Sequence, residues 1–379
     1  MSAAELAVLT ALRINPSEDL GSEQWADSLA AANHDVLVEH AEQEGVAGIL
    51  YKETRRSGLD GSLNPAALER LQAFYRRTAA LNLQRQRDLG EILDACAPRR
   101  TKIVVLKGMS LLDDLYGDPG ERPMSDVDLW IERGDLDQLG ASLRRLGYEA
   151  QPFYPDTFHR GATVVEIHTD LLGASRIRSR ELILAGEQER IFARTEAFAT
   201  CEAPAWRLER HDAVLFACLH LLKHNASRLL WLLEIEAMIR AFDEDDWREV
   251  LGRADAAGQR RAVHQVAFLA DDLLSPVRSS VRGPATKSNF PASLADGSSL
   301  GRLERRALAR RRMRGALPAW GPLIFFSPQR SFRERATSIF ESLFPRPTVL
   351  RQIFEDRTSS IATLYFKRFW QLLEMLVRS

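Results

Sequence analysis

Two short segments near the middle of the chain constrain its fold more than any other feature. Residues 103–106 form a fully apolar, β-branched run, and residues 125–131 alternate two carboxylates with apolar side chains. Short runs of this kind predict buried strands rather than helices. In the second strand Asp126 and Asp128 would point to one face, and the apolar residues between and after them would point into a core.

Two carboxylates that share one face of an apolar strand repel each other unless a cation neutralises them. Oxygen ligands at this spacing suit Mg²⁺ or Mn²⁺. An Asp-x-Asp pair also occurs without a metal on solvated strand edges and loops. Because Asp126 and Asp128 lie within an apolar run, we favour the metal-site interpretation.

A third predicted strand, residues 164–170, places Glu166, His168 and Asp170 on one face. If it lies beside the strand with Asp128, Glu166 becomes a third carboxylate; a shifted register would bring Asp170 there instead. Three carboxylates can hold two cations about 3.5–4 Å apart, a clamp for in-line displacement at phosphorus. The predicted metal ligands and catalytic residues are therefore Asp126, Asp128 and Glu166.

The length of 379 residues exceeds one ordinary core, so several domains are expected. Within them, helices are predicted over 65–96, 110–116, 135–146, 211–240 and 246–274, and the tail after 302 is mostly helical. The predicted regions are an N-terminal helical region 1–98, an α+β domain 99–205, a helical domain 206–274 that packs on the active site, a Ser-, Pro- and Gly-rich linker 275–301, and a C-terminal helical region 302–379.

Composition excludes some partners. A formal net charge of −1 argues against broad electrostatic capture of nucleic acid or of an anionic membrane. The 3 cysteines show no metal-ligand spacing, which favours a reducing compartment. The N-terminal segment lacks the features of a signal peptide, and the longest apolar stretch is too short to span a bilayer. We therefore expect a cytoplasmic protein without a membrane span.

The motifs together resemble a known family. The segment LKGMSLLDDLYGDPGERPMSDVDLWI, followed by VVEIHTDLL, is similar to the uncharacterised nucleotidyltransferase family, within the nucleotidyltransferase superfamily of the DNA polymerase β type. The similarity extends to the flanking segment HLLKHNASRLLWLLEIEAMI. The chain departs from the superfamily motif in two ways: Met109 separates Gly108 from Ser110, and the interval from Ser110 to Asp126 is longer than in the simplest members.

The resemblance implies an α+β fold, with a nucleotidyltransferase-type mixed β-sheet core flanked by N-terminal and C-terminal helical regions. It implies Mg²⁺- or Mn²⁺-dependent transfer of a nucleoside monophosphate from an NTP, with ATP expected, to an unidentified acceptor, and release of pyrophosphate. Asp126 and Asp128 would bind both cations, and Glu166 would complete one site and accept the acceptor's proton. Two alternatives stay open: an enzyme that modifies a peptide or protein by nucleotidylation or phosphoryl transfer, and a nucleotide-binding scaffold without turnover.

Several cations and polar groups are candidates for nucleotide binding. Lys and Arg near the carboxylates can bind phosphate, and Gly108 permits a tight turn before a helix whose amides approach phosphate. A polar stripe at helical spacing, with His220 and Trp231, would form a pocket wall or a plain interdomain face. The predicted nucleotide-binding residues are Lys107, Gly108, Ser110, Arg122, His168, Lys223, His224 and Arg228.

Two features near the C-terminus have simple interpretations. An apolar stripe from Ile361 to Leu376 predicts a helix that docks on the protein's own core. An arginine-rich tract lacks interleaved aromatic residues, so a solvated helix face is favoured over an RNA-binding surface. Its members are Arg302, Arg305, Arg306, Arg310, Arg311, Arg312 and Arg314. The acceptor, the preferred NTP and the oligomeric state are left open by the sequence.

Overall fold

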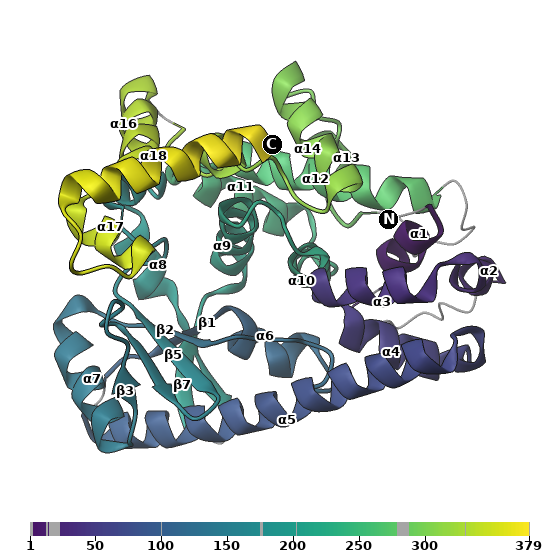
Figure 1. The fold of residues 1–379 in the computed structure, drawn as a ribbon, viewed down its shortest axis with the longest axis horizontal. Helices are drawn as coiled ribbons and strands as arrows, with labels where there is room; N and C mark the ends of the chain where they lie inside the picture. The colour runs from purple at the N-terminus through teal and green to yellow at the C-terminus, as the bar shows by residue number, and fades with distance from the viewer. Residues whose placement is uncertain are drawn as a thin grey trace.

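The computed structural model describes residues 3–12, 14, 23–99, 101–174, 177–201, 203–278, 288–329 and 331–378. Within these residues, seven strands form one mixed sheet in the order β3-β4-β5-β2-β1-β7-β6. Helices cover the sheet and extend well beyond it (Figure 1). The α+β class expected from the sequence is confirmed.

The strands are β1 (Val104–Leu106), β2 (Val127–Trp130), β3 (Glu149–Ala150), β4 (Thr157–Arg160), β5 (Thr163–His168), β6 (Glu196–Thr200) and β7 (Ala203–Arg207). The α-helices are α1 (Ala3–Ala11), α2 (Glu23–Ala31), α3 (His34–Gln43), α4 (Ala47–Arg56), α5 (Pro65–Cys96), α6 (Lys107–Leu115), α7 (Leu136–Arg145), α8 (Gln188–Arg194), α9 (Arg210–Lys223), α10 (Leu229–Met238), α11 (Glu244–Ala256), α12 (Arg260–Arg278), α13 (Ala292–Ala295), α14 (Arg302–Arg314), α15 (Gly321–Phe325), α16 (Phe332–Leu343), α17 (Pro347–Phe354) and α18 (Ile361–Arg378). Short 3₁₀ turns are η1 (Asp60–Ser62), η2 (Ala97–Arg99), η3 (Arg133–Asp135) and η4 (Arg178–Ile183).

The three strands predicted from the sequence form the centre of the sheet. β2 pairs antiparallel with β1 and parallel with β5. The side chains of β1 are all buried, as expected for an apolar β-branched run. In the β2–β5 pair Asp128 lies opposite Glu166, which is the register that the carboxylate hypothesis requires. The outer strands β3, β4, β6 and β7 were not predicted.

Helix α5 connects the N-terminal helices to the sheet. Its bounds agree with the predicted helix over 65–96. The side chain of Asn64 caps its first turn, and proline follows at the first helical position. Along its length α5 contacts α3 and α4 at one end and β5, β7 and α7 at the other (Figure 1). Its Asp88 accepts hydrogen bonds from Arg160 at 2.6 Å and from Thr163, which attaches the helix to the sheet.

The predicted continuous helix over 211–240 is wrong, because the chain breaks into α9 and α10. Asn225 and Ala226 adopt left-handed backbone angles, with φ of +59° and +47°. The carbonyl of Asn225 accepts the backbone N–H of Leu317 at 2.8 Å, and the carbonyl of Ala226 accepts the guanidinium of Arg311. Contacts from the C-terminal region therefore hold this break, although alanine rarely adopts such a conformation.

Two other predicted helices have different bounds. The predicted helix over 246–274 is interrupted between α11 and α12, where Gly258 has φ of +68°. Glycine commonly ends a helix in this left-handed conformation. The second predicted helix, over 110–116, begins earlier, at Lys107.

The C-terminal third packs more closely than the sequence indicated. α12 runs to Arg278, into the segment expected to be a linker, and residues 279–287 lie outside the described part. Ser288 and Asn289 hydrogen-bond to Glu236 of α10. The solvated-face prediction is wrong for Arg311, which is buried in an ion pair with Glu44 at 2.5 Å. The domain boundaries themselves stay a prediction.

Helix α18 packs beside α17. Leu364 is fully buried, but Phe369 is 50% exposed and Ile361 45% exposed, so the predicted apolar stripe covers the core only in part. None of the described helices combines the length and the apolar composition needed to cross a membrane.

One glycine tests how the N-terminal helices fit the loop before β2. A Cβ on Gly48 of α4 would lie 2.2 Å from the carbonyl oxygen of Gly120, so Gly48→Ala should lower the melting temperature by several degrees. The matched control is Gly252→Ala in α11, where a Cβ meets no neighbouring atom within 4 Å. That change should raise the melting temperature slightly, because alanine favours helix by about 1 kcal/mol over glycine. Equal shifts measured by circular dichroism would contradict this packing.

Candidate functional site

Three of the predicted residues converge at the centre of the sheet. Asp128 of β2 and both Glu166 and His168 of β5 each offer a ligand atom, and these atoms all lie within 4.8 Å of one another. Nε2 of His168 is 2.6 Å from Oδ1 of Asp128 and 3.7 Å from Oε2 of Glu166. The cluster follows from the parallel pairing of β2 and β5, which sets Asp128 beside Glu166.

Lys107 supplies a positive charge to this cluster. It follows β1 directly, begins α6, and its Nζ donates a hydrogen bond to Oδ1 of Asp128 at 2.6 Å. Its backbone adopts φ of +51°, a strained conformation for a residue with a side chain. Burial alone would raise the pKa of Asp128, but Lys107 and the hydrogen bond from His168 hold that pKa well below its usual range.

The pKa values of the other two carboxylates shift in the opposite direction. Burial, followed by the charge of Asp128, raises the pKa of Asp126 and that of Glu166. Asp126 lies just before β2 and is electrostatically coupled to the cluster, but it is not among the three residues whose ligand atoms converge. Crowded carboxylates of this kind gain from a nearby cation, because a cation relieves their repulsion.

The alternative ligand Asp170 has another role. Its buried carboxylate accepts the backbone N–H groups of Leu172 at 3.1 Å and of Ala174 at 2.6 Å. It therefore caps the turn that follows β5, while Glu166 is the residue opposite Asp128.

Gly108 and Ser110 organise the first turn of α6. The left-handed residue is Lys107 rather than Gly108, so the predicted reason for the glycine needs correction. A Cβ on Gly108 would lie 2.2 Å from Nη1 of Arg122, so the glycine provides space for that guanidinium. The hydroxyl of Ser110 donates to the carbonyl of Lys107 at 2.8 Å.

Arg122 is buried and paired. Its Nε lies 2.5 Å from Oε1 of Glu234 in α10, and the hydroxyl of Tyr116 donates to the same oxygen at 2.9 Å. Asn82 of α5 donates to the carbonyl of Arg122 at 2.7 Å. These contacts join α5, α6 and α10, and they engage the guanidinium that was predicted to bind phosphate.

The C-terminal end of α9 adds one cation, Lys223, on the side of the carboxylates. Within the described part of the chain, the ammonium of Lys223 has no hydrogen-bond or ion-pair partner. Burial, followed by the charges of Arg180 and Lys107, lowers the pKa of Lys223 to about 7. Desolvation of the imidazole, followed by the charge of Lys223, lowers the pKa of His224 to about 4. The charges of Arg180 and Lys107 repel the ammonium of Lys223, so an anion beside these three residues is favoured.

The predicted polar stripe forms despite the break after α9. The rings of His220 and His224 lie 4.6 Å apart, and Trp231 lies 4.9 Å from His220. The guanidinium of Arg228 stacks 5.5 Å from the ring of Trp231. The residues meet because α10 folds back beside α9, not because one helix carries them.

Sequence reasoning missed two charged residues near the site. Arg180 lies in the turn η4, and its Nη1 donates to the carbonyl of Leu172 at 3.2 Å. Asp156 precedes β4, where burial raises its pKa and the charge of His168 partly offsets that rise. Neither had a usable signal, since β4 and η4 follow no clear periodicity in the sequence.

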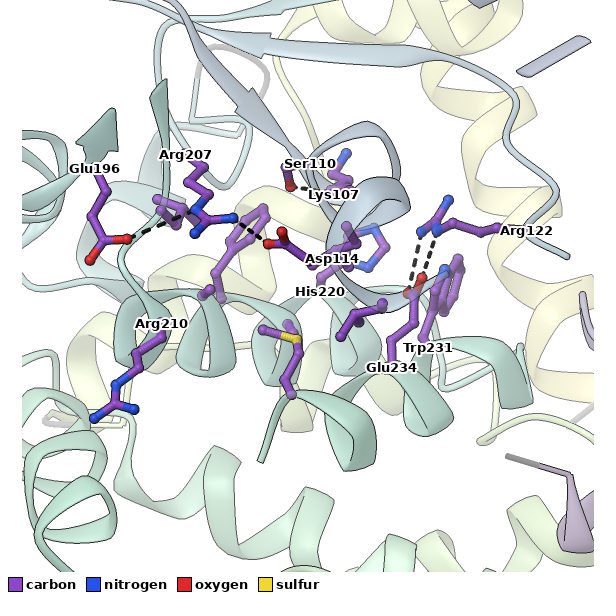
Figure 2. Close-up of a pocket in the computed structure, with 17 residues that line it drawn as sticks. Lys107, Ser110, Asp114, Arg122, Glu196, Arg207, Arg210, His220, Trp231 and Glu234 are labelled. Carbon is purple, nitrogen blue, oxygen red and sulfur yellow. Dashed lines mark hydrogen bonds and ion pairs between the residues drawn. The ribbon is translucent and has the colours of Figure 1, made fainter. Parts of the chain in front are cut away.

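A pocket opens beside the carboxylate cluster, between α6, α9 and α10 (Figure 2). Its empty space, the open mouth included, is about 1060 Å³. Lys107 and Ser110 line one part of it, so the pocket adjoins the cluster through Lys107. At one end Arg207 pairs with Asp114 and lies 3.8 Å from Glu196, as Figure 2 shows.

Comparison with known proteins identifies a family. The family model described as "Uncharacterised nucleotidyltransferase" matches residues 30–275. This range contains the whole sheet, the carboxylate cluster and helices α9 and α10. No curated protein and no solved structure matches the chain.

The lowered pKa of Lys223 predicts a pH-dependent stability. Below pH 7 the folded chain carries the full cost of this charge, and between about pH 7 and pH 10 the cost disappears because only the unfolded chain keeps the proton. Lys223→Met should therefore raise the melting temperature most at about pH 6, and the gain should shrink as the pH rises. Calorimetry with the exposed Lys367→Met as control checks this; a pH-independent gain would refute it.

Proposed function

Because the chain belongs to the uncharacterised nucleotidyltransferase family, we propose that it transfers a nucleoside monophosphate from an NTP to an acceptor hydroxyl and releases pyrophosphate. The observation that carries the proposal is the cluster of Asp128, Glu166 and His168 with Lys107 and Lys223 on the same side. We also propose that β1, α6, β2 and β5 form the nucleotidyltransferase-type core of the sheet.

The donor set fits a divalent cation. Two carboxylates and one imidazole converge, and Asp126 is close enough to influence the pKa of Glu166. Carboxylates suit Mg²⁺ and Mn²⁺ alike, whereas an imidazole nitrogen favours the transition metal. A bound cation would stabilise charge on the attacking oxygen and on the leaving pyrophosphate.

Different residues would accept the proton and bind the triphosphate in the proposed reaction. The acceptor oxygen forms a bond to the α-phosphorus, the bond from that phosphorus to the bridging oxygen of the β-phosphate breaks, and pyrophosphate leaves with the electron pair. Glu166, whose pKa is raised, would take the hydroxyl proton. Lys223, Arg180 and Lys107 would bind the triphosphate, which supplies the anion that their mutual repulsion favours.

Removal of the central carboxylate should abolish activity. Asp128→Asn removes a metal ligand and the partner of Lys107, so Mg²⁺-dependent pyrophosphate release should fall more than about 100-fold, since loss of an outer-shell partner alone costs roughly 10–100-fold. Asp137→Asn in the exposed first turn of α7 is the matched control and should retain activity. Pyrophosphate release by an enzyme-coupled assay measures both.

Two results would reject the proposal. Unchanged turnover in the double variant Asp126→Asn, Asp128→Asn would exclude these carboxylates. Calorimetric binding of Mg²⁺–ATP without pyrophosphate release, for any of the four NTPs with cell metabolites and peptides, would favour the nucleotide-binding scaffold. Intact-mass analysis of peptides and proteins after incubation would identify a macromolecular acceptor.

The imidazole predicts the metal preference. Because His168 adds a nitrogen ligand to two carboxylates, the protein should bind Mn²⁺ more tightly than Mg²⁺. His168→Asn replaces this nitrogen with a side chain that can offer oxygen, so the ratio of the two affinities should narrow. Titration calorimetry of each metal with the wild type and the variant measures this ratio. An unchanged ratio would place His168 outside the metal's ligand set.

A further inference from the structure

The pocket beside Lys107 is elongated and follows one face of each helix that lines it. On α6 the lining residues recur at helical spacing, namely Lys107, Ser110, Leu111, Asp114 and Leu115. On α9 the lining extends from Arg210 to His220. At 1.5 Å of rise per residue, these stretches correspond to roughly 12–15 Å of pocket.

The charged groups of this lining are paired, some within the lining and two, Lys107 and Arg210, with Asp128 and Asp246 outside it. Asp114 and Glu196 are both near Arg207, and Glu234 pairs with Arg122 (Figure 2). Paired charges are poor partners for a further ion, because a new ion must compete with the existing one. Most of the remaining wall is apolar and includes Leu111, Leu115, Phe216, Ala217, Trp231 and Met238.

His220 is the exception in this apolar wall. Its side chain contacts Phe216, His224 and Trp231 by ring packing, and within the described residues its ring nitrogens have no hydrogen-bond partner. Burial, followed by the charge of Lys107, lowers its pKa well below the usual range, so the ring is neutral at pH 7. A neutral imidazole can accept a hydrogen bond from a hydroxyl.

The pocket and the cation Lys223 lie in different directions along α9 from His220. Lys223 and His224 follow His220 along α9 and do not line the pocket, whereas the lining continues toward the N-terminal end of the same helix. The triphosphate and the contents of the pocket would therefore approach Lys107 from two sides. This is the arrangement that a transfer between a nucleotide and a second substrate requires.

We propose that this pocket binds the acceptor, a small molecule with an elongated aromatic or alkyl body and a hydroxyl group at the end near Lys107. The apolar walls of α6, α9 and α10 hold the body, and His220 accepts a hydrogen bond from the hydroxyl when the acceptor binds. The hydroxyl turns its proton from His220 to Glu166 when its oxygen attacks phosphorus. The proposal rests on the proposed nucleotidyl transfer and names the class of its second substrate.

A neutral fluorescent probe, N-phenyl-1-naphthylamine, tests the pocket itself. The wild type should bind it, and Ala217→Phe on α9 should weaken binding by roughly tenfold or more, because the added ring fills the space. Leu111→Phe on the opposite wall gives a second, independent obstruction. Ala362→Phe on the exposed face of α18 is the matched control and should bind like the wild type. Melting temperatures verify that each variant is folded.

The role of His220 has its own measurement. Displacement of the probe by 2-naphthol and by naphthalene compares two ligands that differ by one hydroxyl. The wild type should prefer 2-naphthol, and His220→Phe, which keeps a ring but removes the nitrogens, should reduce that preference while the probe still binds. If the wild type and His220→Phe prefer 2-naphthol over naphthalene by the same factor, His220 does not bind the hydroxyl and that part of the proposal is wrong.

Nucleotide binding separates this proposal from the previous one. Ala217→Phe should bind Mg²⁺–ATP as the wild type does, because no cation near the carboxylates is altered. Loss of Mg²⁺–ATP binding in folded Ala217→Phe would make the pocket a nucleobase site and overturn the proposal, as would unchanged probe binding in both filled variants. Failure of the wild type to bind or turn over Mg²⁺–NTP would instead reject the nucleotidyltransferase function, and the probe would still report on the pocket.

Discussion

The pairing of β2 with β5 is the constraint on which the rest of the site depends. It places Asp128, a nearly buried carboxylate, beside Glu166 and within 2.6 Å of His168. A buried charge is costly unless it is paired, so this arrangement requires Lys107 at the end of β1. The strained backbone of Lys107 is compatible with a stable fold because β1, β2 and α6 all hold the residue in place.

Around this centre the chain separates three kinds of surface. Carboxylates gather on the sheet, the ammonium of Lys223 lies at the C-terminal end of α9, and apolar side chains line the pocket toward the N-terminal end of that helix. The ion pair of Arg122 with Glu234 attaches the loop between α6 and β2 to α10 beside that pocket. A single helix, α9, therefore contributes to both the polar and the apolar part.

The sequence predicted the centre of the site better than its surroundings. β-branched runs and strict alternation identify β1, β2 and β5, and alternation alone brings Glu166 and His168 to one face. The outer strands are short and partly exposed, such as Glu149–Ala150, so they have no distinct pattern. The pairing of Arg122 with Glu234, 112 residues away, depends on tertiary packing and has no local signal. Alternation also predicted Asp126 among the converging ligands. Alternation gives the face of a strand but not the position of a carboxylate just before the strand begins.

The break after α9 depends on a residue far along the chain. Arg311 binds the carbonyl of Ala226 from 85 residues away, and it lies beyond residues 30–275, which the family model matches. Lys223 and His224 end the helix immediately before this break. The C-terminal helices therefore help to fix where Lys223 lies, although none of their residues belongs to the carboxylate cluster.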